Sequence, residues 1–236
     1  MNREGSKQKA YRIWGIHVVE EVLDESPEMV EKIFLDKNYY SSEAKKLIQR
    51  AKEIGIPVVQ GYFPEKVGAQ MAVVRFRSLD DLDPDTDHLG IVLDGITDEH
   101  NIGSIFRTAA AFGAKFALVP KRRFGSISPL VARISQGGVY KIKIIKVNLE
   151  PALHHLKDSG YWLYVTHVSK SAQNIYNVSF DRNAIFIMGR EDKGVSKTLL
   201  KLADEKIYIP MVGMQSLNVG VATGIVLYEY RRQWQP

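Results

Sequence analysis

The sequence predicts an α/β protein whose larger part is a parallel sheet covered by helices on both faces. Short segments that are apolar at nearly every position, such as residues 184–188, are typical of strands buried on both sides. Segments with helical spacing of apolar residues lie between these strands. The connections are short, which favours alternation of strand and helix in one sheet over separate all-β and all-α regions.

The first 77 residues predict a small α/β unit. Val18, Val19, Val22 and Leu23 recur at helical spacing, so a first helix begins near Ile16. By the same criteria we expect strands at 32–36, 56–59 and 72–76 and a helix at 42–54. Residues 1–10 are polar and basic, and we expect them to form a flexible tail.

A change in composition separates this unit from the rest of the chain. Residues 79–88 hold five aspartates around Pro84 and little that could be buried. The sequence therefore predicts a small domain at 11–77, an acidic linker at 78–88 and a larger domain at 89–236.

The larger domain alternates strands and helices to the end of the chain. Strands are predicted at 89–94, 116–119, 142–147, 162–166, 184–188 and 207–210, and helices at 102–112, 129–135, 149–157, 196–203 and 217–231. Asn101 is placed as the N-cap of the helix at 102–112. Ligands of parallel sheets bind at the carboxyl ends of strands, so the segments after 94, 188 and 210 are the candidate binding loops.

Composition excludes several classes of protein. The chain has 236 residues, 45% of them hydrophobic, and no cysteine, which rules out disulfides and thiolate chemistry. Its six histidines form no ligand cluster, so no metal is expected. Neither a signal peptide nor an apolar span of about 20 residues is visible, and we expect a cytoplasmic protein. The net charge of +5 fits a nucleic-acid partner.

Residues 209–222 form an uncharged run in a chain that is 25% charged. We expect this run to be buried or to enclose a ligand or a second chain. Polar groups inside it would cost about 1–3 kcal/mol each if left unpaired, so Gln215, Ser216 and Asn218 should have partners.

Three motifs follow predicted strands. They are Asn101-x-Gly103-x-x-x-Arg107, Gly189-x-Glu191-x-x-Gly194, and residues 209–222. Taken singly, the first also fits a capped helix with a surface arginine, the second a charged turn, and the third an irregular core strand before a buried helix. The second motif lacks the spacing of a dinucleotide fingerprint or a P-loop.

In this order the three motifs resemble the SpoU (TrmH) family of RNA ribose 2'-O-methyltransferases. The resemblance covers about residues 89–233 and implies a SPOUT domain with a trefoil knot that binds S-adenosyl-L-methionine and works as a homodimer. The unit at 11–77 is similar to the L30e-like substrate-binding domain of the family's 23S rRNA guanosine methyltransferases. That layout implies ribosomal RNA, and a guanosine of 23S rRNA, as the substrate.

The resemblance also implies which residues act. The catalytic group is Arg107, Asn101, Glu191, Ser216 and Asn218, and the cofactor-binding group is Gly189, Ile209, Met211, Gly213, Leu217 and Asn218. Ile209 and Leu217 are expected to sandwich the adenine. From their charge and position, apart from the resemblance, we expect Lys121, Arg122 and Arg123 to contact RNA, with Arg12, Lys37, Tyr39 and Tyr40 as a second surface on the small domain. Each also fits a solvated basic loop. Between Gly213 and Ser216 the chain has two residues where relatives usually have three, which alters the loop around the cofactor.

Methyl transfer to a ribose hydroxyl is an in-line displacement in which positioning supplies most of the rate. The resemblance implies Arg107 at the catalytic centre, either as the base that removes the hydroxyl proton or as a charged positioning group. An arginine side chain stays protonated at neutral pH, so we expect Arg107 to contact the 2'-hydroxyl and its neighbouring phosphate as a cation, with Glu191 and Asn218 fixing Arg107 and the loops. Three alternatives remain: a tRNA 2'-O-methyltransferase, a resistance methyltransferase acting on another ribosomal nucleotide, and a non-catalytic RNA-binding assembly factor.

Overall fold

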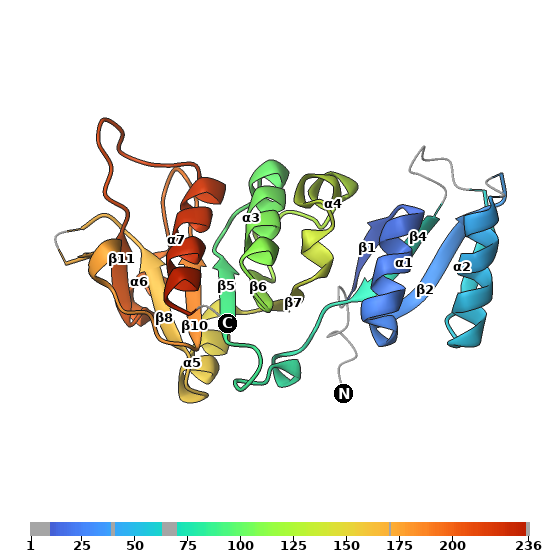
Figure 1. Ribbon diagram of the computed structural model, residues 1–236, viewed down its shortest axis with the longest axis horizontal. Coiled ribbons are helices and arrows are strands. Elements are labelled where there is room, and N and C mark those ends of the chain that lie inside the picture. The colour runs from blue at the N-terminus through green and yellow to red at the C-terminus, as the bar shows by residue number, and fades with distance from the viewer. Residues whose placement is uncertain (1–9, 39–40, 63–69, 170, 235–236) are drawn as a thin grey trace, which may run out of the picture. The chain divides into compact units, whose positions relative to one another are not determined.

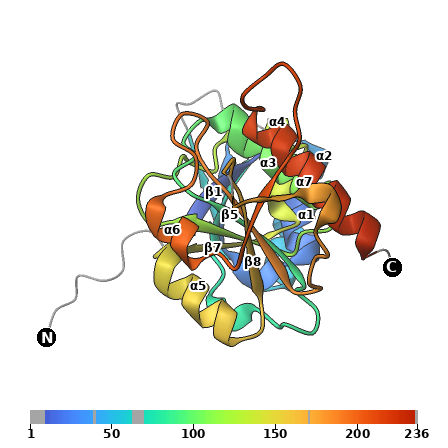
Figure 2. The ribbon, with the colours of Figure 1, turned by 90° about the vertical axis from the view of Figure 1, so that its left-hand side faces the viewer.

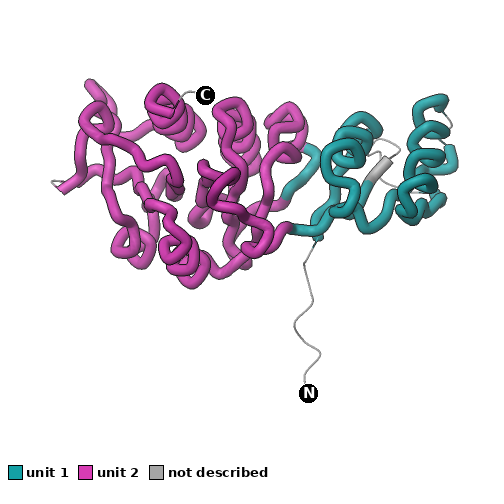
Figure 3. Tube along the Cα trace, turned by 60° about the horizontal axis from the view of Figure 1, so that its bottom comes forward, with its two compact units in different colours: residues 1–76, 127–129 teal, residues 77–126, 130–236 magenta. Residues whose placement is uncertain are grey.

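The structure is a computed structural model that describes residues 10–38, 41–62, 70–169 and 171–234. Its contacts divide the chain into two compact units (Figure 3). Unit 1 comprises residues 1–76 and 127–129, and unit 2 comprises 77–126 and 130–236. We describe each unit by itself.

Unit 1 is built on a four-stranded sheet with the order β1-β4-β2-β3. Its elements are β1 (Ala10–Trp14), α1 (Ile16–Glu25), β2 (Val30–Asp36), α2 (Ser42–Glu53), β3 (Val58–Gly61) and β4 (Gln70–Arg75). The pairs β1–β4 and β2–β4 are antiparallel, whereas β2 and β3 are parallel and joined by α2. Val19, Val22 and Leu23 are buried on α1, as their spacing predicts.

Strand β1 was not predicted. Residues 1–10 were expected to be a flexible tail, but Ala10 begins β1, and residues 1–9 lie outside the described part of the chain. Only Ile13 of the five strand residues is buried, so the local pattern is too weak to identify a strand. The strand forms through pairing with β4, where Ala10 lies opposite Arg75, more than sixty positions away in the sequence.

Unit 2 contains a seven-stranded sheet with the order β7-β6-β5-β10-β8-β11-β9 (Figure 1). All its strand pairs are parallel, which confirms the predicted fold class. The strands are β5 (Leu89–Leu93), β6 (Phe116–Pro120), β7 (Lys143–Val147), β8 (Trp162–Thr166), β9 (Gln173–Asn174), β10 (Ala184–Met188) and β11 (Glu205–Tyr208). The two-residue strand β9 was not predicted.

Helices cover both faces of this sheet. Figure 2 shows α3 (Glu99–Ala111) and α7 (Val219–Gln233) on one side of the strands, and α5 (Leu149–Asp158) and α6 (Lys197–Leu202) on the other. A short helix, α4 (Pro129–Ser135), follows β6. On β10, Ile185 and Ile187 join the core beneath α5 and α6, while Phe186 packs edge-on against Tyr230 of α7. The strand is apolar on both faces because both faces are covered.

The predicted acidic linker, residues 78–88, belongs to unit 2. Leu79 and Leu82 lie against the core beneath α5 and α6. Asp87 is 3% exposed and accepts a hydrogen bond of 2.7 Å from the Nζ of Lys143 on β7. Among residues 79–88 Asp87 alone is buried, so the expectation of little to bury is confirmed except at this aspartate, whose lysine partner the local sequence does not reveal.

Helix α3 begins earlier than predicted. Its N-cap is Asp98, whose carboxylate accepts a hydrogen bond of 2.9 Å from the backbone N–H of Asn101. The assignment of Asn101 as N-cap was therefore wrong. Aspartate and asparagine are both good N-caps. Because Asp98 caps the helix, Asn101 lies in the first turn and its side chain is available for other contacts.

Within the described residues, no helix has the length and apolar character needed to cross a membrane. The same residues contain no group of three or more histidines and carboxylates close enough together to hold a metal ion.

Candidate active site

A pocket of about 210 Å³ lies at the carboxyl ends of β8, β10 and β11. We call it the strand-end pocket. Three loops and the start of α7 line it, and the lining residues are 166–168, 188–191, 194–195, 207–209, 211, 215–217, 219 and 222. This is the edge of the sheet at which parallel α/β proteins bind ligands.

The turn after β10 is closed tightly. The backbone groups of Arg190 and Gly194 exchange two hydrogen bonds of 3.1 and 2.8 Å. A Cβ atom on Gly189 would lie 2.3 Å from the backbone of Gly194, so only glycine fits at position 189. The guanidinium of Arg190 donates two hydrogen bonds to Asp192, and this holds the pKa of the Asp192 carboxyl below its usual value.

Glu191, in the same turn, joins three segments that are far apart in the sequence. Its Oε1 accepts hydrogen bonds from the side-chain amides of Asn101, at 3.2 Å, and Asn218, at 2.7 Å. The backbone N–H of Val219 approaches the same oxygen at 3.5 Å. Asn218 also donates to the Oδ1 of Asn101 at 2.8 Å. We call these three side chains the amide–carboxylate cluster.

Asn218 has a second role as the N-cap of α7. Its Oδ1 accepts hydrogen bonds from the backbone N–H groups of Gly220 and Val221, at 2.9 and 3.4 Å. One side chain therefore caps α7 and ties it to the turn after β10 and to the first turn of α3.

Arg107 does not join the cluster. Its side chain is exposed on α3 and makes no ion pair or hydrogen bond to another described residue. The expectation that Glu191 and Asn218 fix Arg107 was therefore wrong, whereas the expectation that they fix the loops is confirmed by their mutual hydrogen bond. Both bind Asn101 instead, because Asn101 lies in the first turn of α3 and Arg107 is six residues further along the helix.

The uncharged loop is only partly buried in the single chain. Val212 is fully exposed and Met214 is 73% exposed, so the central part of this run is not buried within the single chain, and its enclosure of a ligand or a second chain stays a prediction. Asn218 has the partners that we expected. The side chains of Gln215 and Ser216 line the pocket and make no hydrogen bond to another described residue.

The predicted cofactor residues divide into two groups. Gly189, Ile209, Met211 and Leu217 line the strand-end pocket, whereas Gly213 and Asn218 do not. Among the catalytic predictions, Glu191 and Ser216 line the pocket, and Asn101, Arg107 and Asn218 lie outside the lining.

The sequence analysis missed the contribution of β8. Thr166, His167 and Val168 line the pocket where β8 ends, between β10 and β11 in the sheet. The carboxyl end of the strand predicted at 162–166 could have been included among the candidate binding loops. The order of the strands, which makes β8 a neighbour of β10, was not visible in the sequence.

The predicted RNA-binding residues lie in both units. Arg12 is exposed on β1 in unit 1, and Tyr39 and Tyr40 lie outside the described residues. In unit 2, Lys121 and Arg122 line an open hollow of about 730 Å³ at the ends of β5, β6 and β7. Arg123 follows with φ of 60°, a left-handed conformation that costs a non-glycine residue about 1 kcal/mol.

Two family models match this chain. The model described as "SpoU rRNA Methylase family" matches residues 88–228, and that described as "RNA 2'-O ribose methyltransferase substrate binding" matches residues 12–60. The first match covers the strand-end pocket and the amide–carboxylate cluster, and the second lies in unit 1.

Individual proteins also match over almost the whole chain. A 23S rRNA (guanosine-2'-O-)-methyltransferase from Acinetobacter baylyi is 35% identical over 93% of this chain and 96% of its own length. A putative TrmH family tRNA/rRNA methyltransferase from Bacillus subtilis is 32% identical over 98% of each chain. The crystal structure of an AdoMet-bound rRNA methyltransferase from Sinorhizobium meliloti superposes with a TM-score of 0.79 and 21% identity, covering 97% of this chain and 89% of that one.

Proposed function

Because this chain belongs to the SpoU rRNA methylase family, we propose that it methylates the ribose 2'-hydroxyl of a guanosine in 23S rRNA, using S-adenosylmethionine. The observation that carries the proposal is the amide–carboxylate cluster. It brings the three motifs of the family together at the rim of a strand-end pocket.

The lining of the pocket fits the cofactor. S-adenosylmethionine supplies an electrophilic methyl group on a positively charged sulfur, so a second cation beside that sulfur would be unfavourable. The one arginine in the lining, Arg190, has its guanidinium engaged by Asp192. Ile209, Met211 and Leu217 offer apolar surface for an adenine, and backbone groups near Gly189 offer hydrogen bonds to its edge.

Arg107 is the residue proposed to act on the RNA. Its exposed guanidinium has no carboxylate partner among the described residues, so it is available to bind a phosphate of the RNA. A guanidinium binds phosphate through two parallel hydrogen bonds. In this position it contacts the 2'-hydroxyl and stabilises the negative charge that appears on its oxygen as the hydroxyl proton leaves to solvent. That oxygen then bonds to the methyl carbon as the bond between the carbon and the cofactor's sulfur breaks. Asn101 and Ser216 orient the ribose.

We propose that RNA is bound by both units. The match of residues 12–60 to a substrate-binding model supports a role for unit 1, including Arg12. In unit 2, the loop Lys121-Arg122-Arg123 presents three cations beside an open hollow at the same edge of the sheet as the strand-end pocket. The strained backbone of Arg123 is consistent with a functional loop.

We also propose the knot and the homodimer that the family resemblance implies. Residues 209–218 lead from β11 to α7, which lies on the face of the sheet opposite α6, and they are the segment that the resemblance implies to be threaded. Single-molecule stretching tests the knot. An unknotted chain pulled from its two ends extends to roughly 3.3–3.6 Å per residue, and a knotted chain stops at a shorter length because residues remain in the tightened knot. Val221 and Tyr228 are exposed on α7, 52% and 59%, and offer an apolar face to a second copy. Sedimentation at micromolar concentration tests the dimer.

The decisive experiment is transfer of a labelled methyl group to unmodified 23S rRNA and to tRNA, followed by mapping of the modified ribose. The proposal expects label in one guanosine of 23S rRNA. Label in tRNA alone would instead support the second candidate, a tRNA methyltransferase. The Bacillus relative, described as a putative tRNA/rRNA methyltransferase, is the observation that favours this candidate. Failure to bind S-adenosylmethionine in calorimetry would contradict both and favour an assembly factor.

A further inference from the structure

Unit 1 contains a cavity of its own, of about 260 Å³, beside α2. It opens where the parallel strands β2 and β3 end, with Asp36 of β2 opposite Gly61 of β3. A water molecule in the liquid occupies about 30 Å³, so the cavity is large enough to admit an organic group. None of the predicted catalytic or cofactor-binding residues lines it.

The topology around this cavity is that of a ligand site. Strand β2, helix α2 and strand β3 form a βαβ unit, and ligands bind at the carboxyl ends of such parallel strands. The rim is held by backbone contacts. The N–H of Lys37 donates to the carbonyl of Gly61 at 2.9 Å, and the N–H of Asn38 donates to Asp36 at 2.8 Å.

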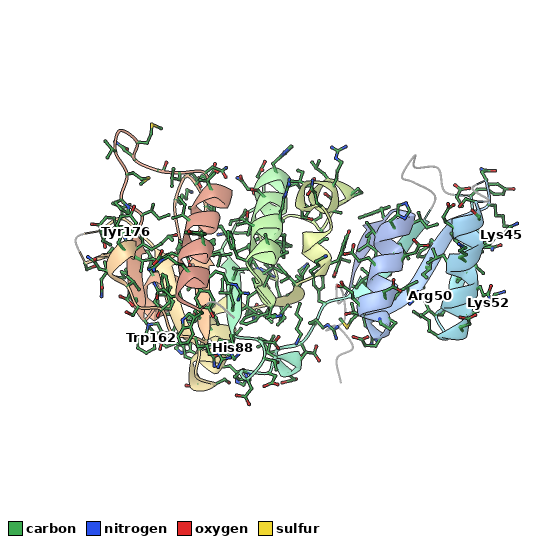
Figure 4. All side chains as sticks on the ribbon, viewed as in Figure 1. Lys45, Arg50, Lys52, His88, Trp162 and Tyr176 are labelled. Atoms are coloured by element: carbon green, nitrogen blue, oxygen red, sulfur yellow. The ribbon has the colours of Figure 1, made fainter. Side chains whose placement is uncertain are left out.

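The walls combine an apolar floor with a polar rim. Leu35 and Ala44 are each 3% exposed and form the floor with the half-buried Ile48. Lys45, shown on α2 in Figure 4, and Gln60 of β3 are exposed at the rim. An apolar floor does not suit a phosphate, which is strongly hydrated. It suits a flat ring whose edge makes hydrogen bonds with rim groups.

An aromatic side chain stands beside the cavity. Tyr62 directly follows β3 and is 71% exposed. The Nζ of Lys37, a lining residue, lies 5.9 Å from the centroid of its ring. An exposed aromatic ring next to a cation is the combination that binds single-stranded nucleic acid, in which the base stacks and the phosphate pairs with the cation.

We propose that this cavity, which we call the base pocket, receives an unpaired nucleobase of the substrate RNA. The base stacks on Tyr62 and enters over the floor at Leu35, and Lys37 and Lys45 contact the flanking phosphates. The inference rests on the proposed function for the identity of the strand, since all the lining residues fall within the match to the substrate-binding model. It adds that unit 1 selects single-stranded RNA.

The test measures binding of the full chain to a short fluorescent single-stranded RNA of mixed sequence, and to the same strand annealed to its complement. Tyr62→Ala is expected to weaken single-strand binding about tenfold, the loss of one stacked base, and to leave duplex binding unchanged. Ile48→Phe, which fills the cavity from a half-buried position, is expected to have the same effect. Tyr176→Ala is the matched control, because Tyr176 is 72% exposed in unit 2 (Figure 4).

Thermal unfolding of each variant shows whether a loss of binding reflects a loss of fold. The proposal of a base pocket is wrong if folded Tyr62→Ala and Ile48→Phe variants bind single-stranded RNA like the parent. It is also wrong if they lose single-strand and duplex binding equally. Titration with S-adenosylmethionine separates this outcome from failure of the proposed function. A chain that binds no cofactor but still needs Tyr62 for single-strand binding would retain the base pocket and lose the methyltransferase assignment.

Discussion

At the scale of single residues, Glu191 is the point at which the three motifs meet. Its Oε1 accepts hydrogen bonds from Asn101 and Asn218, and a carboxylate oxygen accepts such bonds more strongly than an amide oxygen does. The cluster therefore depends on a negative charge at position 191 as well as on the shape of the side chain.

We predict that Glu191→Gln weakens binding of S-adenosylmethionine about tenfold. The amide keeps one acceptor oxygen but loses the charge, so Asn218 and the loop before it are held less firmly. Calorimetric titration measures the effect, and Glu150→Gln, an exposed glutamate in the first turn of α5, is the control. Unchanged affinity in Glu191→Gln would show that the amide–carboxylate cluster does not support binding of the cofactor in the strand-end pocket.

Arg107 is expected to act in a different step. We predict that Arg107→Lys lowers the rate constant of methyl transfer about 100-fold, the effect of removing one preorganised donor, because a lysine keeps the charge but cannot bind a phosphate through two parallel hydrogen bonds. Affinity for S-adenosylmethionine should not change, since Arg107 does not line the pocket. Single-turnover methyl transfer measures the rate, with Arg133→Lys on α4 as the control. Near-normal turnover would contradict the two-bond contact.

At the scale of elements, α3 and α7 pack closely because small residues face each other. A Cβ atom on Gly220 would lie 2.4 Å from the Oγ of Ser104, whereas one on Gly224 would lie 3.5 Å from the side chain of Thr108. Both glycines are on α7, one turn apart. This close approach brings the N-cap Asn218 within reach of Asn101.

The two glycines provide a matched pair of substitutions. We predict that Gly220→Ala lowers the free energy of unfolding by about 1–3 kcal/mol, because the added methyl group forces the helices apart. Gly224→Ala, with ordinary contact distances, should be neutral or stabilise by up to about 1 kcal/mol through its higher helix propensity. Urea unfolding measures both. Equal effects would show that the close packing at Gly220 relaxes at no cost.

The C-terminal half of α7 is anchored by Tyr230. Its hydroxyl donates a hydrogen bond of 2.6 Å to the carbonyl of Arg182, and burial raises the pKa of Tyr230 to about 12. In the unfolded chain the group has its ordinary pKa of 10.0, so the folded state holds the proton more tightly. This contribution to stability is complete below pH 10 and is lost as the pH rises towards 12.

We therefore predict that Tyr230→Phe costs about 1 kcal/mol at pH 8 and makes the loss of stability between pH 10 and 12 less steep. Urea unfolding at several pH values measures both effects. Tyr176→Phe is the control, because Tyr176 is 72% exposed. A variant whose stability falls with pH as steeply as that of the parent would mean that Tyr230 does not contribute to the alkaline transition.

At the scale of the whole molecule, the net charge of +5 contributes to RNA binding mainly where lysine and arginine side chains are clustered. Removing Lys121 or Arg122 should weaken binding to any RNA sequence similarly and reduce the slope of log affinity against log salt by roughly 0.7–0.9 per residue. Fluorescence anisotropy at several salt concentrations measures the slope. Lys201→Ala on α6 keeps the parent slope if the effect is local. The prediction fails if all three variants behave alike.

The alternation of apolar strands and helices was sufficient to predict most elements of unit 2, because residues 89–94 and 184–188 carry the pattern of strands buried on both faces. Strand β1 and the packing of Asp87 on Lys143 were not predictable. Their partners lie more than fifty positions away, and the local sequence carries no trace of them.

By itself, the sequence determined the parallel α/β class, the family, and the three segments that form the site. The tertiary structure alone decided which side chains meet. Glu191 binds Asn101 and Asn218 rather than Arg107, and β8 contributes Thr166 to the pocket. The physical reason is that motifs are local, whereas hydrogen-bond partners are set by strand order and by the separation of α3 and α7.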